Sequence, residues 1–94
     1  MRDGDAAGVE RLAAFRHELR LVSRDPARNR HRFYALAWQP SLFGEPVLVR
    51  SWGRLGTVGR SRASFYPDPA TAHAAIVALL RRRLRHGYEV VAWR

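Results

Sequence analysis

The sequence contains neither cysteine nor lysine among its 94 residues. Without cysteine the protein has no disulfide framework, no thiolate nucleophile and no thiolate metal ligand, so its fold must be held by packing alone. This absence agrees with a reducing compartment, and we expect a cytoplasmic protein. All seventeen basic residues are arginine, because lysine is missing.

Long apolar runs are also missing. Charged residues interrupt residues 1–15, which therefore lack the apolar segment of a signal peptide. The longest uncharged run of the second half, residues 69–80, is too short and too rich in alanine to span a bilayer. We therefore expect no association with membranes.

Acidic residues are few and unevenly placed. Eight carboxylates against seventeen arginines give a formal net charge of +9. Residues 1–22 carry four arginines and four carboxylates, whereas residues 23–94 carry thirteen arginines and four carboxylates and hence the whole excess. A compact domain with a pI near 11.6 attracts polyanions. We therefore expect DNA or another nucleic acid as the partner.

The composition and the hydrophobic pattern predict one folded domain. A hydrophobic content of 47% is too high for a disordered chain, and the length allows one core. Residues 1–8 are expected to be a flexible N-terminus, and residues 9–94 a single domain. Alternating apolar residues and β-branched or aromatic runs predict strands. The expected strands are residues 15–21, 32–38, 47–52, 57–66 and 88–93.

A long helix is predicted between Asp68 and Gly87. Asp68 is a typical N-cap, Pro69 suits the first helical position, and Gly87 suits the position after the helix end. Apolar residues recur between them at helical spacing: Ala72, Ala75, Ile76, Leu79, Leu80 and Leu84. The predicted fold class is therefore α+β, an antiparallel meander sheet of four to five strands with one long C-terminal helix packed on one face.

Few residues point to catalysis. The four histidines are scattered without metal-ligand spacing, and no two carboxylates form an obvious acid–base pair. Glycines recur at positions 53, 56 and 59, but they match neither G-x-G-x-x-G nor a Walker loop with its lysine, so a glycine-rich turn explains them better. We expect no enzyme, no cofactor and no metal site.

One stretch carries a specific pattern. It reads Arg-Ser-Trp-Gly-Arg-Leu-Gly-Thr-Val-Gly-Arg over residues 50–60, and it resembles the signature of the WGR domain family, named for Trp-Gly-Arg. The context matches too: Asn29 precedes Arg32-Phe33-Tyr34, a helix follows the motif, and Gly87-Tyr88 comes near the end. The resemblance covers about residues 15–90. It departs at Leu55, where the family usually has isoleucine, and at Arg60, where glutamine is most common.

The resemblance implies an antiparallel sheet with a helix against it and a role in DNA binding. In the poly(ADP-ribose) polymerases activated by DNA damage, this domain grips DNA near a strand break. The motif tryptophan packs there on the sugar and base at a strand end, and the motif arginine reaches the backbone. Those positions are Trp52 and Arg54 here. A polymerase domain does not fit in 94 residues, so only the binding role carries over, as in small bacterial proteins that contain the domain.

The candidate nucleic-acid-binding residues are one aromatic residue and six arginines: Trp52, Arg54, Arg50, Arg60, Arg62, Arg30 and Arg32. Trp52 is either a stacking platform or a core residue, because its strand parity is shared by two arginines but also by Leu48. Arg54 either contacts a phosphate or bonds carbonyl groups of the turn.

The remaining arginines fall into three groups. Arg60 and Arg62 are expected to form an outward pair on the strand after the motif. Arg28, Arg30 and Arg32 are expected to form a second basic edge at the first turn. Residues 81–85 are explained most simply as charges at a helix end, so they are left out of the site.

Two functions from different classes follow. The favoured one is a non-enzymatic module that recognises DNA ends, nicks or single strands through arginine–phosphate contacts and Trp52 stacking. The alternative is a protein-interaction or regulatory adaptor that docks an acidic partner, with Trp38, Leu42 and Phe43 as an exposed apolar anchor. Packing in the core or the loop explains those three residues more simply.

Overall fold

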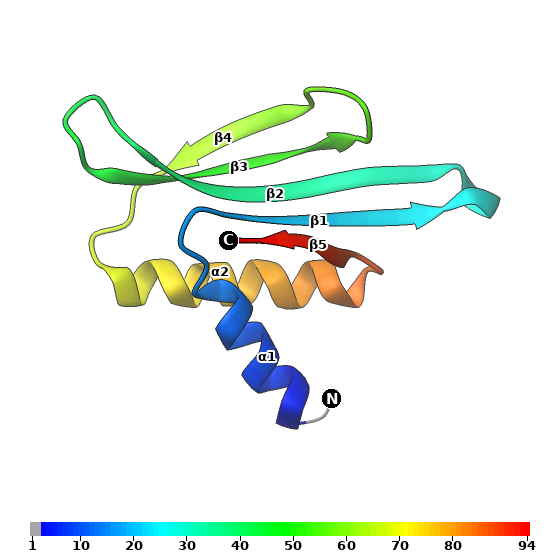
Figure 1. The fold of residues 1–94 in the computed structure, drawn as a ribbon, viewed down its shortest axis with the longest axis horizontal. Coiled ribbons are helices and arrows are strands. Elements are labelled where there is room, and N and C mark those ends of the chain that lie inside the picture. The colour runs from blue at the N-terminus through cyan, green and yellow to red at the C-terminus, as the bar shows by residue number, and fades with distance from the viewer. Residues whose placement is uncertain (1–2) are drawn as a thin grey trace.

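The computed structural model describes residues 3–94, with side chains described from residue 8. Figure 1 shows a five-stranded sheet, a long helix lying along one side of it, and a shorter N-terminal helix that leads away. The elements in chain order are α1 (Asp3–Ala13), β1 (Glu18–Asp25), the 3-10 turn η1 (Pro26–Arg28), β2 (Arg30–Pro40), β3 (Pro46–Arg54), β4 (Arg60–Ser64), α2 (Pro69–Arg85) and β5 (Glu89–Trp93).

Neighbouring strands are antiparallel, in the order β4-β3-β2-β1-β5. The first four strands follow one another as a meander, and α2 then returns the chain so that β5 pairs with β1 (Figure 1). The long strand β2 pairs with all of β1 on one side and all of β3 on the other. The α+β class and the single long C-terminal helix predicted from the sequence are confirmed.

Helix α2 begins and ends where the sequence indicates. The Asp68 carboxylate accepts a hydrogen bond from the Thr71 N–H at 2.7 Å, which is an N-cap. At the other end the Tyr88 N–H donates to the Arg83 carbonyl at 3.2 Å, and Gly87 takes a φ of +82°. This is a Schellman ending, and it turns the chain directly into β5.

The core lies between the sheet and α2. Its fully buried members come from the strand face toward α2 and from α2 itself: Leu19, Leu21, Tyr34, Leu36, Leu48, Ile76 and Leu80. Strand pairing places Leu19 beside Leu36 and Leu21 beside Tyr34, so alternate residues of β1 and β2 share one face. The apolar periodicity seen in the sequence is therefore the core-facing pattern.

Helix α1 is missing from the sequence-based prediction, which has a flexible N-terminus to residue 8 and a strand from residue 15. The helix packs against α2, with Val9 and Ala13 buried and the His73 Nε2 3.1 Å from the Glu10 carbonyl oxygen. Strand β1 begins only at Glu18. Residues 1 and 2 lie outside the described part, and the mobility of residues 1–8 stays a prediction.

Candidate functional site

One end of the sheet carries a pocket in which five of the ten lining residues are arginine. It has a volume of about 590 Å³ and lies where the β1–β2 turn, the end of β3 and the end of α2 meet. We call it the arginine pocket and define it by its lining residues, Arg28, Asn29, Arg30, His31, Arg32, Trp52, Gly53, Arg54, Arg83 and Tyr88. An adjoining hollow runs along the end of α2 and is lined by Arg30, Arg32, Arg83, Arg85, His86, Gly87 and Tyr88. Because they share four residues, the two form one continuous surface.

The lining of the arginine pocket contains five guanidinium groups and no carboxylate. Among the side chains of residues 8–94, the ion pairs are Arg28–Asp25 at 3.6 Å and Arg94–Glu18 at 3.9 Å, so four of the five have no carboxylate partner there. These arginines cannot relieve their mutual repulsion by losing protons, because guanidinium stays charged at physiological pH. An anion bound in the pocket would relieve this repulsion.

Trp52 lies half-buried between the core and the arginine pocket. It packs against the edge of the core cluster and also lines the pocket. On β3 it is paired with Tyr34 of β2 and with Arg60 of β4, and the Arg50 guanidinium carbon lies 5.9 Å from its ring centroid. The two alternatives drawn from its strand parity are therefore not exclusive: one part of the ring serves packing, and another part faces the pocket.

The end of α2 contributes Arg83 and Tyr88, which the sequence analysis leaves out of the site. The guanidinium carbon of Arg83 lies 4.2 Å from the ring centroid of Tyr34 and 5.7 Å from that of Tyr88. Within the described residues, its buried Nε has no hydrogen-bond partner. Aromatic faces therefore hold Arg83 in place without neutralising its charge.

A signal for Arg83 was present in the sequence. A helix that ends at Gly87 with a Schellman motif brings Tyr88 back to the residue five positions earlier, which is Arg83. Arg83 and Arg85 are in the last turn of α2, as the sequence indicates, and they also line the continuous surface.

The β1–β2 turn brings three further arginines to the same pocket. Asn29 follows η1 in the left-handed conformation, with a φ of 52°, and its Oδ1 lies 3.5 Å from the Nη2 of Arg54. Arg28, Arg30 and Arg32 therefore line the arginine pocket together with Arg54. The three arginines at the first turn are therefore not separate from the Trp-Gly-Arg motif, because both line the same pocket.

Arg50, Arg60 and Arg62 lie on the same face of the sheet as Trp52 but outside the arginine pocket. Strand pairing sets Arg60 beside Trp52 and Arg62 beside Arg50. Arg60 and Arg62 are exposed, as the sequence analysis expects, whereas Arg50 is half-buried. Together they extend the positive surface from the pocket across β3 and β4.

Two of the motif glycines serve the packing of Phe33. This residue lies on the sheet face away from α2, yet it is only 3% exposed. A Cβ on Gly53 would lie 2.8 Å from the Cα of Gly59, and a Cβ on Gly59 would collide with the Trp52 carbonyl and lie 2.9 Å from the Phe33 ring. Arg20 covers the ring as well, with its guanidinium carbon 4.6 Å from the centroid. The loop is therefore a tight structural turn, as the sequence indicates.

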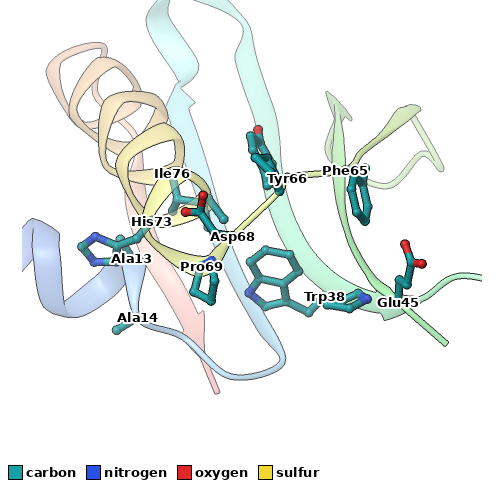
Figure 2. A pocket seen from close by; sticks show the side chains of 13 residues that line it. Ala13, Ala14, Trp38, Glu45, Phe65, Tyr66, Asp68, Pro69, His73 and Ile76 are labelled. Carbon is teal, nitrogen blue, oxygen red and sulfur yellow. The ribbon is translucent and has the colours of Figure 1, made fainter.

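A pocket of opposite character lies at the other end of the sheet (Figure 2). Its volume is about 620 Å³, and it opens beside the start of α2, with Trp38 of β2 and the segment after β4 forming much of its wall. We call it the apolar pocket and define it by its lining residues, Ala13, Ala14, Trp38, Glu45, Pro46, Phe65, Tyr66, Pro67, Asp68, Pro69, Ala72, His73 and Ile76. No arginine is among them.

The loop between β2 and β3 lies at this same end. Its residues Leu42 and Phe43 are 97% and 90% exposed, so the expectation that they pack in the core or the loop is wrong. Trp38, grouped with them in the sequence analysis, is half-buried and stacks on Phe15 with ring centroids 6.4 Å apart. Of the three residues expected as an apolar anchor, two are therefore exposed, Leu42 and Phe43.

The arginine pocket offers binding chemistry more than proton-transfer chemistry. Its lining includes one imidazole, from His31, and no carboxylate. Among the described residues, no group of three or more His, Asp or Glu side chains is placed to hold a metal ion. The arrangement is suited to an anionic ligand that also presents a flat ring or a sugar to Trp52.

Comparison with known proteins gives three findings. A family model described as the WGR domain matches residues 17–92. The uncharacterized protein y4dW of Sinorhizobium fredii (strain NBRC 101917 / NGR234) is 39% identical over 64 residues, which are 68% of this chain and 31% of that protein. A crystal structure of a protein from Bacteroides fragilis is similar with a TM-score of 0.65 at 17% identity, over 80% of this chain and 19% of that one. The last similarity shows the fold alone, and the chain spans less than a third of either relative.

Proposed function

Because the chain belongs to the WGR domain family, we propose that it is a nucleic-acid-binding module that holds DNA ends, nicks or single strands in the arginine pocket. WGR domains are generally nucleic-acid-binding modules. The finer assignment, to particular DNA structures and particular side chains, is the proposal, and it rests on the geometry of the pocket.

The observation that carries the proposal is the composition of one pocket. Five arginines and a half-buried tryptophan line it, and no carboxylate does. Guanidinium groups bind phosphate oxygens in bidentate fashion, and an aromatic face stacks on a base or sugar. A polyanion without rings contacts only the guanidinium groups, whereas a nucleic acid contacts the guanidinium groups and also stacks on the tryptophan.

Each candidate residue has a role in this proposal. Arg30, Arg32 and Arg54 neutralise phosphates at the pocket, and Trp52 stacks on an unpaired base or a terminal sugar. The exposed Arg60 and Arg62 of β4 and the half-buried Arg50 of β3 contact the neighbouring phosphates of the same strand.

The position of the pocket favours recognition of structure over sequence. Only the C-terminal end of α2 reaches it, since the apolar side of that helix is buried against the sheet. Helix α1 leads away from the sheet, and none of its described residues lines the pocket, so the pocket presents no recognition helix to read base edges in a major groove. A strand end or an unpaired base therefore fits the pocket better than the interior of a duplex.

The test is a fluorescence anisotropy titration of the full chain with blunt, nicked and single-stranded DNA, and with RNA of the same sequence. Arg54→Gln is expected to weaken DNA binding at least about tenfold, because a charged hydrogen bond to phosphate is lost. Arg81→Gln is the matched control: it removes the same charge from an exposed position of α2 outside both hollows. Its effect is expected to stay within about twofold.

A conservative variant separates charge from geometry. Arg54→Lys keeps the charge but not the planar fork, so we expect it to bind more weakly than the parent as well. Equal losses for Arg54→Gln and Arg81→Gln would contradict the proposal, since binding would then follow net charge and not the pocket.

A titration with polyglutamate distinguishes nucleic-acid binding from the alternative function, an adaptor for an acidic protein. Such a partner pairs with arginines but has no ring to stack on Trp52. Polyglutamate binding as tight as that of single-stranded DNA, with no effect of Trp52→Ala on either, would replace our proposal by the adaptor.

In this proposal the chain is a binding module, not an enzyme, and needs no cofactor. No helix in residues 3–94 combines the length and the apolarity that a membrane span requires. The cytoplasmic location expected from the sequence stays a prediction, as does the bacterial origin that the resemblance to small bacterial proteins suggests.

A further inference from the structure

No side chain of the described residues fills the apolar pocket, although the exposed Leu42 and Phe43 lie close to it. Its lining includes three aromatic residues, Trp38, Phe65 and Tyr66, and its volume of about 620 Å³ lies within the usual range of ligand-binding pockets, roughly 300–1,000 Å³. Glu45 and Pro46 belong to the lining, whereas Leu42 and Phe43 of the same hairpin do not.

The β2–β3 loop presents the complementary shape. Leu42 and Phe43 are adjacent and almost fully exposed, at the tip of the hairpin whose base borders the apolar pocket. Isolated exposed apolar residues are ordinary, but a leucine and a phenylalanine side by side at a loop tip, next to an apolar pocket, are what a contact surface requires.

The charge distribution allows two copies of this strongly basic chain to meet at this end. The pocket lining contains two carboxylates, from Glu45 and Asp68, and no arginine. Of the arginines close by, Arg94 is paired with the Glu18 carboxylate at 3.9 Å. The arginine pocket lies at the opposite end of a molecule that measures 45 Å along its longest axis (Figure 1). In a pair that meets at the apolar ends, the two arginine pockets are separated by several Debye lengths of about 8 Å, so their mutual repulsion is largely screened.

We propose that two copies of the chain associate about a two-fold axis, with Leu42 and Phe43 of each copy inserted into the apolar pocket of the other. The two-fold axis makes the two contacts identical: the loop of each copy lies in the pocket of the other, so both loops and both pockets are covered. This proposal goes beyond nucleic-acid binding and does not depend on it, because it uses none of the residues of the arginine pocket.

The interface is of modest size. Burial of one phenylalanine side chain removes about 150–250 Å² of its surface from water. The total area buried by two loops and the pocket walls that they cover is therefore near the lower limit of about 1,000 Å² for a specific interface. We therefore expect a reversible dimer. Its dissociation constant should change little or fall at high salt, because apolar burial drives it.

The test is sedimentation equilibrium of the full chain, freed of nucleic acid, over a wide range of protein concentration and at low and high salt. The double variant Leu42→Ser/Phe43→Ser is expected to raise the dissociation constant at least about a hundredfold. Val58→Ser is the matched control, because Val58 is also 90% exposed but lies on the β3–β4 loop. It should leave the dimer unchanged, and circular dichroism checks that both variants stay folded.

A mixing experiment tests the exchange itself. Phe65→Asp places a charge at the mouth of the apolar pocket, at a residue that is 60% exposed, and leaves the loop intact. This variant and the loop double variant should each be monomeric, but their mixture keeps one intact loop and one intact pocket. It should dimerise more tightly than either variant alone and less tightly than the parent.

Three results would overturn the proposal. A parent chain that stays monomeric at every concentration would leave the pocket to a different partner. A dimer that Val58→Ser weakens as much as the loop variant does would have another interface. A mixture no more associated than its components would exclude the reciprocal insertion.

Discussion

Trp52 has two environments, and its substitution should therefore have two separable effects. The side chain packs against the edge of the core and also lines the arginine pocket. A fully buried aromatic residue costs about 3–5 kcal/mol when truncated, and a stacked base is worth about 1–3 kcal/mol. Because Trp52 is only partly buried, neither figure alone describes it.

Trp52→Ala is expected to lower the free energy of unfolding by about 1–3 kcal/mol, since part of the ring is buried, and still to leave a folded domain. The folded variant should bind single-stranded DNA more weakly by about 1–3 kcal/mol. Urea denaturation and an anisotropy titration measure the two quantities. Trp52→Phe, which keeps most of the packing, is the control. A folded Trp52→Ala that binds like the parent would make the residue structural only.

The sequence allowed part of the arginine pocket to be predicted. Trp52 and Arg54 were recognisable from the motif, and Arg30 and Arg32 from their local charge. That these four lie together was not predictable from strand parity, because it depends on how the β1–β2 turn meets the end of β3. Arg83 was missed since its role depends on the Tyr34 ring, which is remote in the chain.

The β3–β4 loop shows why a glycine is required at one position and only preferred at another. Gly59 has a φ of +71°, and a Cβ there would collide with the Trp52 carbonyl. Gly56 has a φ of +86°, but a Cβ there would meet nothing within 4 Å. The two positions share the backbone strain of an L-residue and differ in the space available.

Gly59→Ala is accordingly expected to lower the free energy of unfolding by more than about 3 kcal/mol, from strain and collision together. Gly56→Ala should cost only about 1–2 kcal/mol, from strain alone. Urea denaturation of both variants measures the difference. Equal costs would mean that the loop relaxes around the added methyl group and that its closeness to Phe33 is not essential.

The N-cap of α2 makes a contribution that depends on pH. The backbone hydrogen bond from Thr71, followed by that from its side chain, holds the pKa of Asp68 below its ordinary value. The folded state therefore favours the ionised carboxylate. Its contribution to stability is full above the ordinary aspartate pKa of about 3.9 and is lost as the pH falls through the lowered folded value.

Asp68→Ala is expected to lower the Tm at neutral pH by about 4–8 °C, because Thr71 loses its hydrogen-bond acceptor. Asp68→Asn, which caps without a charge, should lose much less. Thermal melts at neutral and acidic pH measure both variants. The gap between the parent and Asp68→Ala should close as the pH is lowered, and a gap independent of pH would contradict the assigned role of the carboxylate.

Strands and the long helix were predictable because their signals are local. Alternating apolar residues marked the strands, and Asp68, Pro69 and Gly87 marked the helix ends. Strand β4 is shorter than the predicted 57–66, since residues 57–59 belong to the loop over Phe33. Helix α1 was missed because Val9 and Leu12 are its only apolar residues larger than alanine, and because its buried positions, Val9 and Ala13, belong to a core shared with α2.

The molecule has two chemically different ends. The arginine pocket and the β1–β2 turn occupy one end, and the apolar pocket with the exposed Leu42 and Phe43 occupies the other (Figure 1, Figure 2). Binding at the first end should respond strongly to salt, whereas association at the second should not. This separation allows the two proposals to be tested independently on the same protein.

The affinity for DNA is expected to fall with salt at a log–log slope of roughly −3 to −5, as for the release of counterions from four to six phosphates. The reason is the excess of thirteen arginines over four carboxylates in residues 23–94. Titrations at several salt concentrations give the slope, and Arg54→Gln should reduce its magnitude by about one. An affinity that does not change with salt would be incompatible with phosphate contacts.

The two outermost strands of the sheet have a consequence for colloidal behaviour. β4 and β5 are five residues each, β4 carries Arg60 and Arg62, and the pairing of β5 with β1 is interrupted by a bulge. Short, charged or bulged edges keep sheets of different molecules from joining into aggregates. Arg60 and Arg62 therefore protect an open edge as well as extending the positive surface. A variant that removes both should be examined by light scattering before any loss of DNA binding is assigned to missing phosphate contacts.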